Sequence, residues 1–158
     1  MLIRLICSAA LVVGALAFSS LATVQAAEGD GIVKFKSAYP MPETIERMKK
    51  DIADKGIKFF DEIDQSKLAA DAGITLLPST LLVFGNPPLG TLFITADPDA
   101  GLDWPVRLLV YQDAKGDVWV AYTDSAWIAR SHGITNRDKK FKMASEVISS
   151  ITSTVKAK

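Results

Sequence analysis

Cysteine is almost absent from this chain, and histidine occurs only once. The single cysteine among 158 residues, Cys7, lies in an apolar N-terminal stretch that we expect to be removed. The mature protein would then form no disulfide, no thiolate metal site and no cysteine nucleophile. A stable fold does not require them, because a domain of about 130 residues buries enough apolar surface without covalent cross-links.

The N-terminus predicts export. Arg4 supplies a positive charge, residues 5–18 are apolar apart from Ser8, and small residues lead up to Ala26. This order is typical of a secretory signal peptide, so we predict cleavage after Ala26 and a periplasmic or secreted protein. The alternative is a retained membrane anchor. The apolar stretch of about 14 residues is shorter than the ~20 residues that span a bilayer, which favours cleavage.

The length of the chain predicts one domain after the signal. Residues 1–26 are assigned to the signal peptide and residues 27–158 to a single domain. The rest of the chain has no apolar segment long enough to cross a membrane, so we expect no stable membrane span after cleavage.

Positive charge is neither in excess nor concentrated. Removing Arg4 with the signal leaves 17 basic against 18 acidic side chains, a formal charge of −1. The densest basic run, residues 137–142, is interrupted by Asp138 and fits the solvated start of a helix. Binding to a phosphate backbone needs clustered Lys and Arg, so we exclude nucleic acid as a partner.

A phosphate-binding lysine is missing from the stretch FGNPPLGT, which otherwise looks like a nucleotide loop. Gly85 and Gly90 have the G-x-x-x-x-G spacing, but the lysine that should follow is absent. Pro87 and Pro88 also remove two backbone donors that a phosphate cradle would use. The stretch is better interpreted as a turn in which Asn86 caps a helix that begins at Pro87.

A calcium loop is also incomplete. Asp97, Asp99 and Asp103 have a spacing that suggests oxygen ligands, but Gly101 is one position early and no glutamate follows where the loop needs one. We therefore predict a polar connection over residues 97–104.

Hydrophobic periodicity predicts strands and helices in an irregular order. Strands are expected over residues 32–36, 57–64, 79–85, 106–113 and 118–123, and helices over residues 42–55, 65–73, 87–96, 125–131 and 138–154. The last two strands form the clearest hairpin, with a glycine in the turn. Adjacent strands late in the chain predict an α+β fold with a largely antiparallel sheet and helices on one side.

Three separated segments resemble the DUF302 domain family, also described as TT1751-like. They are LPSTLLVFGNPPLGT, AGLDWPVRLLVYQDAKGDVWVAYTD and AWIARSHGI, which recur in this order between Leu77 and Ile134. The resemblance implies a curved, mostly antiparallel sheet packed by helices, like that of the TATA-binding protein, and it suggests a homodimer. It implies no reaction. Two positions depart from the family pattern: Ser125, where proline is common, and Trp104, where a smaller apolar residue is common.

His132, the only histidine, stands at the expected end of a helix. The helix dipole favours an imidazole there, so one interpretation is a C-terminal cap. A metal site would need carboxylates, of which Asp124 is the nearest candidate along the chain. A Ser-His-Asp triad with Ser79 or Ser131 is formally available, but the G-x-S-x-G elbow that usually presents the serine is absent.

Arg107 interrupts an apolar strand, PVRLLVY. It either points outward and pairs with an acid on a neighbouring strand, or anchors an anion through its guanidinium group. Aromatic residues near the hairpin could form core, a ligand groove or a dimer interface; they are Tyr111, Trp119, Tyr122 and Trp127.

These features predict a non-enzymatic module that binds a small ligand, such as an organic acid or another anion, in a groove between the sheet and the helix from Pro87. No cofactor and no metal are predicted. The predicted ligand-binding residues are Arg107, His132, Asn86, Asp124 and Tyr122. Two alternatives stay open: a homodimeric protein-interaction module, and a metal-binding protein or enzyme centred on His132.

Overall fold

The computed structural model describes Gly29 and residues 31–158. The predicted signal peptide, residues 1–26, lies outside the described residues. None of the described helices has both the length and the apolar character needed to cross a membrane.

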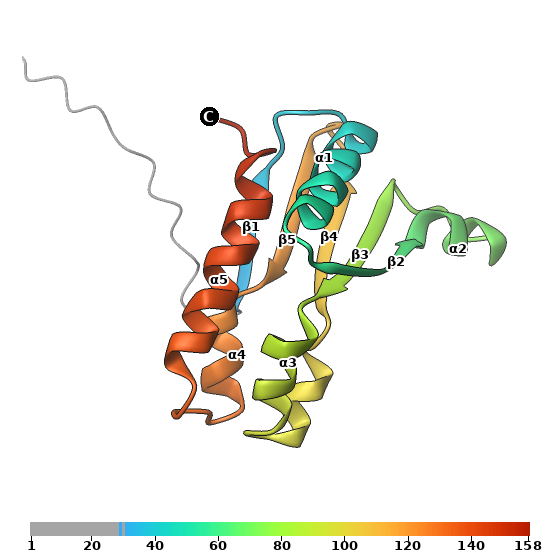
Figure 1. Ribbon diagram of the computed structural model, residues 1–158. Helices are drawn as coiled ribbons and strands as arrows, with labels where there is room; N and C mark the ends of the chain where they lie inside the picture. The colour runs from blue at the N-terminus through green and yellow to red at the C-terminus, as the bar shows by residue number, and fades with distance from the viewer. Residues whose placement is uncertain (1–28, 30) are drawn as a thin grey trace, which may run out of the picture.

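Five antiparallel strands form one open sheet in the order β1-β5-β4-β3-β2 (Figure 1). Their bounds are Ile32–Lys36 for β1, Lys58–Asp64 for β2, Ser79–Gly85 for β3, Val106–Gln112 for β4 and Val118–Thr123 for β5. The predicted hairpin is confirmed as β4 and β5, in which Val110 lies opposite Val120. The first and last strands of this order, β1 and β2, are the sheet edges.

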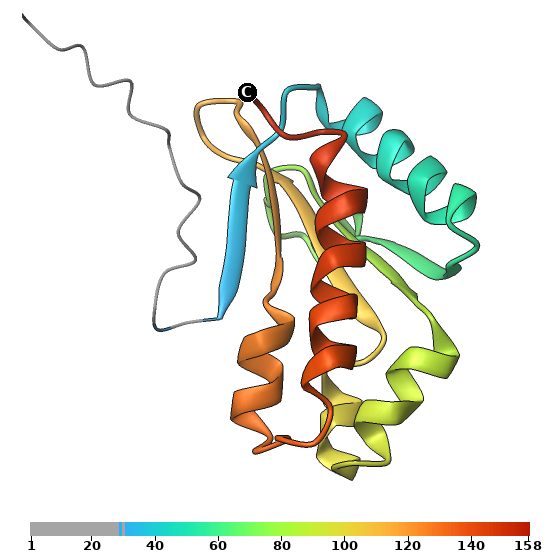
Figure 2. The same ribbon diagram turned by 60° about the vertical axis from the view of Figure 1, so that its left-hand side comes forward.

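The helices are α1 (Met41–Asp54), α2 (Gln65–Asp71), α3 (Pro87–Ile94), α4 (Ser125–Ser131) and α5 (Asp138–Ser153), with a short 3₁₀ helix η1 (Pro98–Leu102). The two long helices, α1 and α5, lie on one face of the sheet (Figures 1 and 2), as the sequence predicts. The helix α1 buries Ile45, Met48 and Ile52, which recur at helical spacing and form one apolar face.

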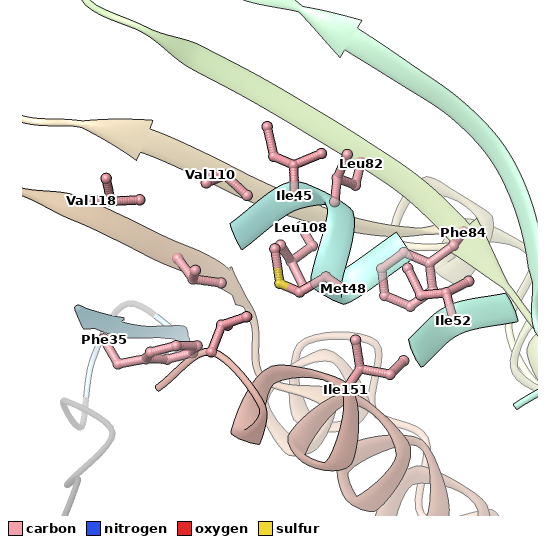
Figure 3. Close-up of a cluster of buried hydrophobic side chains, with 12 residues drawn as sticks. Phe35, Ile45, Met48, Ile52, Leu82, Phe84, Leu108, Val110, Val118 and Ile151 are labelled. Carbon is pink, nitrogen blue, oxygen red and sulfur yellow. The ribbon is translucent and has the colours of Figure 1, made fainter. Parts of the chain in front are cut away.

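The core lies between this face of the sheet and the two long helices (Figure 3). Met48 and Ile52 from α1 and Ile151 from α5 are completely buried against Leu82 and Leu108 of the central strands. Burying side chains of this kind contributes about 1.5–3 kcal/mol each, which makes this cluster the main source of stability.

The two ends of the sheet are built differently. The helices α3, η1 and α4 gather at the end where β4 begins (Figure 1), and the β4–β5 turn lies at the other end. A second, smaller core of Phe93, Ala100, Ile134 and Phe141 packs the helical end. Arg107 and His132 both belong to this end, because Arg107 is near the start of β4 and His132 follows α4.

Candidate functional site

The two glycines of FGNPPLGT, Gly85 and Gly90, pack directly against the indole ring of Trp104. A Cβ atom on Gly90 would lie 1.9 Å from Nε1 of Trp104, and one on Gly85 would lie 3.0 Å from the same atom. The backbone N–H groups of Leu89 and Gly90 already donate to the Asn86 carbonyl, at 3.0 and 2.9 Å. The glycine spacing that suggests a nucleotide loop is therefore explained by the close approach of an indole ring.

His132 is the C-terminal cap of α4, as predicted, and its side chain is held by two acids. Its Nε2 lies 2.8 Å from Oδ2 of Asp103, and its Nδ1 lies 3.8 Å from Oδ2 of Asp97. The imidazole is only 13% exposed. The acid expected to accompany His132 was Asp124, but the contacts come from the loop that carries η1.

Asp103 joins His132 to Arg107. One Arg107 nitrogen donates to Oδ1 of Asp103 at 3.3 Å, so the two oxygens of a single carboxylate hold the histidine and the arginine. The pairing acid is four residues before Arg107, not on a neighbouring strand. Within the described chain, the Arg107 guanidinium has no other hydrogen bond, and its side chain is 52% exposed. Most of its donors therefore remain available.

A small cavity of about 40 Å³ lies beside Arg107 and Asp103. Its polar lining is completed by Thr123 and Ser125, and its walls are apolar side chains that include Phe93 and Phe141. Ser125 is 5% exposed, and neither hydroxyl has a hydrogen-bond partner among the residues that the structure describes. A volume of this size holds a water or a solute of similar size.

A second cavity of about 40 Å³ lies where the sequence predicts a groove, between the sheet and α3. Its lining is almost wholly apolar and includes Ile57, Leu89 and Val147. Trp104 lines both cavities, so its indole forms a common wall.

The other three predicted ligand-binding residues lie outside the His132 cluster. Asn86 caps α3 by accepting from Leu89 N at 3.2 Å, and it also lines the second cavity. Asp124 caps α4 in the same way, by accepting from Ala126 N at 3.2 Å. Tyr122 packs against the main core; burial raises the pKa of its hydroxyl, and a hydrogen bond with Thr152 opposes this effect.

Two of the hairpin aromatics lie on the sheet face away from α1 and α5. The Lys34 ammonium lies 5.1 Å from the ring centre of Tyr111 and 4.6 Å from that of Trp119. The Trp119 N–H donates to Asp113 at 2.9 Å and thereby holds the pKa of that carboxyl below its usual range. The aromatics near the His132 cluster are different residues, Phe93 and Phe141, whose rings stack at 3.9 Å.

The arrangement offers hydrogen-bond donors beside a small cavity, and among the described residues no nucleophile contacts His132. The Ser79 hydroxyl donates to the Gln65 amide at 2.7 Å, and the Ser131 hydroxyl donates to the Ile128 carbonyl at 3.0 Å. Across the described residues, no group of three or more His, Cys, Asp or Glu side chains is placed to hold a metal ion.

The residue that sequence reasoning missed is Asp103. It stands in the aspartate-rich connection that was compared with a calcium loop, and its role depends on a contact 29 residues away in sequence. The sequence contained a partial signal, because a partly buried arginine needs an acidic partner, but it did not indicate which aspartate of this connection supplies it.

Comparison with known proteins gives the family and the fold. A family model described as "Domain of unknown function DUF302" matches residues 33–157. A crystal structure of an uncharacterized conserved DUF302 protein from Bacillus stearothermophilus superposes with a TM-score of 0.72 and 15% identity, covering 80% of this chain and 98% of that one.

Curated relatives are longer proteins. Two named fluoride-specific ion channel FluC 1, from Brucella suis biovar 1 and Brucella abortus biovar 1, are each 36% identical over 104 residues. The match covers 66% of this chain but only 41% and 38% of the relatives, so the chain spans about two fifths of their length. Since the family model covers nearly all of the described residues, this chain belongs to the DUF302 family, with the α+β fold of that family.

Proposed function

We propose that this DUF302 protein is an exported, non-enzymatic module that binds a small anion in the cavity beside Arg107. The observation that carries the proposal is the Ser125 hydroxyl. Ser125 is 5% exposed and lines the cavity, and its hydroxyl, which is open to the cavity, has no hydrogen-bond partner among the described residues. An anion in the cavity can therefore accept a hydrogen bond from this hydroxyl without displacing a protein partner. Arg107, which lines the same cavity, supplies the positive charge.

The volume of the cavity limits the size of the anion. A space of about 40 Å³ accommodates a halide or another solute of water size, and a branched organic acid is too large. The two positions at which this chain departs from the family pattern, Trp104 and Ser125, both line this cavity. The departures support a ligand preference that is particular to this member of the family.

The names of the curated relatives suggest the first anion to test. They are named as fluoride-specific ion channels, and this chain resembles about two fifths of each. Channel activity belongs to those proteins. For this chain, fluoride is proposed only as a ligand of suitable charge and size.

The test is a titration of the purified mature protein with sodium fluoride, chloride and formate, followed by ¹⁹F NMR for fluoride and by calorimetry for all three. We expect saturable binding of a small anion, weakened about tenfold or more in Arg107→Ala because a charged donor is lost. Arg130→Ala removes the same charge from an exposed position of α4 that does not line this cavity, and should leave binding unchanged. Equal affinity in all three proteins would show that Arg107 is not the anchor.

Export makes a separate prediction. Protein recovered from the periplasm or medium should have the intact mass of a chain that begins at Ala27, because the small residues before this position suit signal peptidase. A mass that retains Met1 would show that the N-terminal segment stays attached.

Self-association is the second candidate, and one segment favours it. The arm formed by α2 and the residues before β3 exposes four large apolar side chains, and α2 itself buries none. They are Leu68, Ile74, Leu76 and Leu77, each at least 48% exposed. Apolar surface that projects in this way is typical of a protein interface.

We therefore expect a homodimer in light scattering and a monomer in the double variant Ile74→Asp, Leu77→Asp, since carboxylates in an apolar interface are not solvated. Leu102→Asp is the matched control, because Leu102 is 76% exposed at the opposite end of the fold. A wild-type protein that stays monomeric over a wide concentration range would contradict the prediction.

A further inference from the structure

A broad groove lies at the end of the sheet farthest from the His132 cluster. Its volume is about 760 Å³, which is within the range of sites for small organic ligands. The first turn of α1 forms one wall, and the β4–β5 turn and the start of α2 form the others. Figure 3 shows Val110 and Val118 on the strands beside the end of α1 that carries Ile45, and Val118 lines the groove.

The lining of this groove combines apolar surface with negative charge. Its apolar part comes from α1, the segment before it and the strand ends, and consists of Ala38, Tyr39, Pro40, Met41, Pro42, Ile45, Pro78 and Val118. Four carboxylates line it against a single ammonium, that of Lys36. These carboxylates belong to Glu46, Glu62, Asp64 and Asp117.

The carboxylates are not equally neutralised. Lys49, outside the groove, bridges Glu46 and Glu62 at 3.1 and 2.8 Å, and Lys36 pairs with Asp117 at 2.8 Å. Asp64 has no ion pair among the described residues. It accepts hydrogen bonds from the Ser66 hydroxyl and the Lys67 N–H, and the first of these is the main cause that holds the pKa of Asp64 below its usual range. The Asp64 carboxylate therefore lines the groove without an ion pair among the described residues.

A hydroxyl without a hydrogen-bond partner among the described residues also faces the groove. Thr80 is 6% exposed and lines the groove, and its hydroxyl makes no hydrogen bond within the part of the chain that the structure describes. Thr80 lies opposite Asp64 in the β2–β3 ladder and opposite Val110 in the β3–β4 ladder. The unpaired hydroxyl and the unpaired carboxylate thus lie on neighbouring strands, where one bound donor can reach both.

The spacing of the charges indicates the shape of the ligand. Asp64 ends β2 and Asp117 precedes β5, so the two acids are three strand spacings apart across the sheet, or roughly 14 Å, and about three residues, or roughly 10 Å, apart along the strands. The acids are spread along the groove, and in the described residues they form no cluster that could hold a metal ion. A ligand that matches them carries separated positive charges joined by apolar chain.

We propose that this groove binds a linear aliphatic polyamine. Its terminal ammonium groups lie at Asp64 and Asp117, its methylene groups lie on Pro40, Met41 and Val118, and one ammonium donates to the Thr80 hydroxyl. The site is separate from the anion cavity, because the two lie at opposite ends of the sheet.

The test is calorimetric titration of the mature protein with spermidine at low ionic strength. We expect one saturable site, with affinity about fivefold lower in Asp64→Asn and in Asp117→Asn. Asparagine keeps the capping oxygen that α2 needs from Asp64, so the fold should be retained. Asp138→Asn removes the same charge at the opposite end of the fold and should bind spermidine like the wild type.

Thr80→Val separates ligand binding from folding. Valine has nearly the same shape and removes a hydroxyl that makes no hydrogen bond within the described residues, so the melting temperature of the free protein should change little. Spermidine affinity should fall in the same variant. An affinity unchanged by all three groove substitutions, or lowered equally by Asp138→Asn, would show binding to general negative charge and would overturn the proposal. No heat of binding at millimolar spermidine would overturn it as well.

Discussion

Replacing Gly90 with alanine is expected to lower the free energy of unfolding by about 2–3 kcal/mol, as measured by urea denaturation. The new Cβ would lie 1.9 Å from Nε1 of Trp104 and 2.3 Å from Cδ1, so one methyl group displaces the rigid indole ring. Alanine is the better helix former, but its advantage of about 1 kcal/mol is smaller than the steric cost. The expected sign is therefore opposite to that of most glycine-to-alanine changes within helices.

The cause can be tested with a double-mutant cycle. In a Trp104→Leu background the Gly90→Ala change should cost little, because the ring that it strikes is gone. Gly85→Ala should have an intermediate effect, since its Cβ would approach the same ring only to 3.0 Å. If Gly90→Ala were equally destabilising in the wild-type and Trp104→Leu backgrounds, the glycine would be required by the backbone of α3 and not by contact with the indole.

The elements of the fold could be predicted from sequence because their signals are local. Asn86 followed by Pro87 predicts the start of α3, and the structure places the cap and the first residue there. The apolar runs that form β3, β4 and β5 predicted strand bounds that agree with the structure to within one residue. These signals depend on backbone hydrogen bonding and side-chain periodicity over a few residues, which a single sequence displays directly.

The candidate site could be predicted only in part, because it depends on contacts between distant segments. Arg107 and His132 were selected for their chemistry, and the structure brings them to the same carboxylate. Asp103 could not be selected from its neighbours, since several aspartates in the same connection were equivalent in sequence. Thr80 and Ser125 could not be selected from the sequence for another reason. A hydroxyl indicates a site only when the structure shows that it lines a cavity and has no hydrogen-bond partner.

Replacing Asp103 with asparagine is expected to raise the affinity of the Arg107 cavity for a small anion by about tenfold. The Asp103 carboxylate lines the cavity and holds Arg107, so it competes with the anion for the guanidinium and repels it. Asparagine keeps one oxygen for Arg107 and one amide for His132, but it removes the charge. The free protein should become less stable by about 1–2 kcal/mol, because hydrogen bonds to a charged acceptor are the stronger ones.

The opposite signs of these two effects make the result decisive. A residue that only supports the fold would lower both stability and binding when it is replaced, whereas a competing carboxylate lowers stability and raises binding. Asp99→Asn, which removes a charge from an exposed position of η1, the 3₁₀ helix that ends just before Asp103, should change neither quantity appreciably. If anion affinity instead falls in Asp103→Asn, Asp103 positions Arg107 for the ligand. The orientation that Asp103 imposes on Arg107, and not the number of Arg107 donors left unpaired, would then determine which anion the cavity binds.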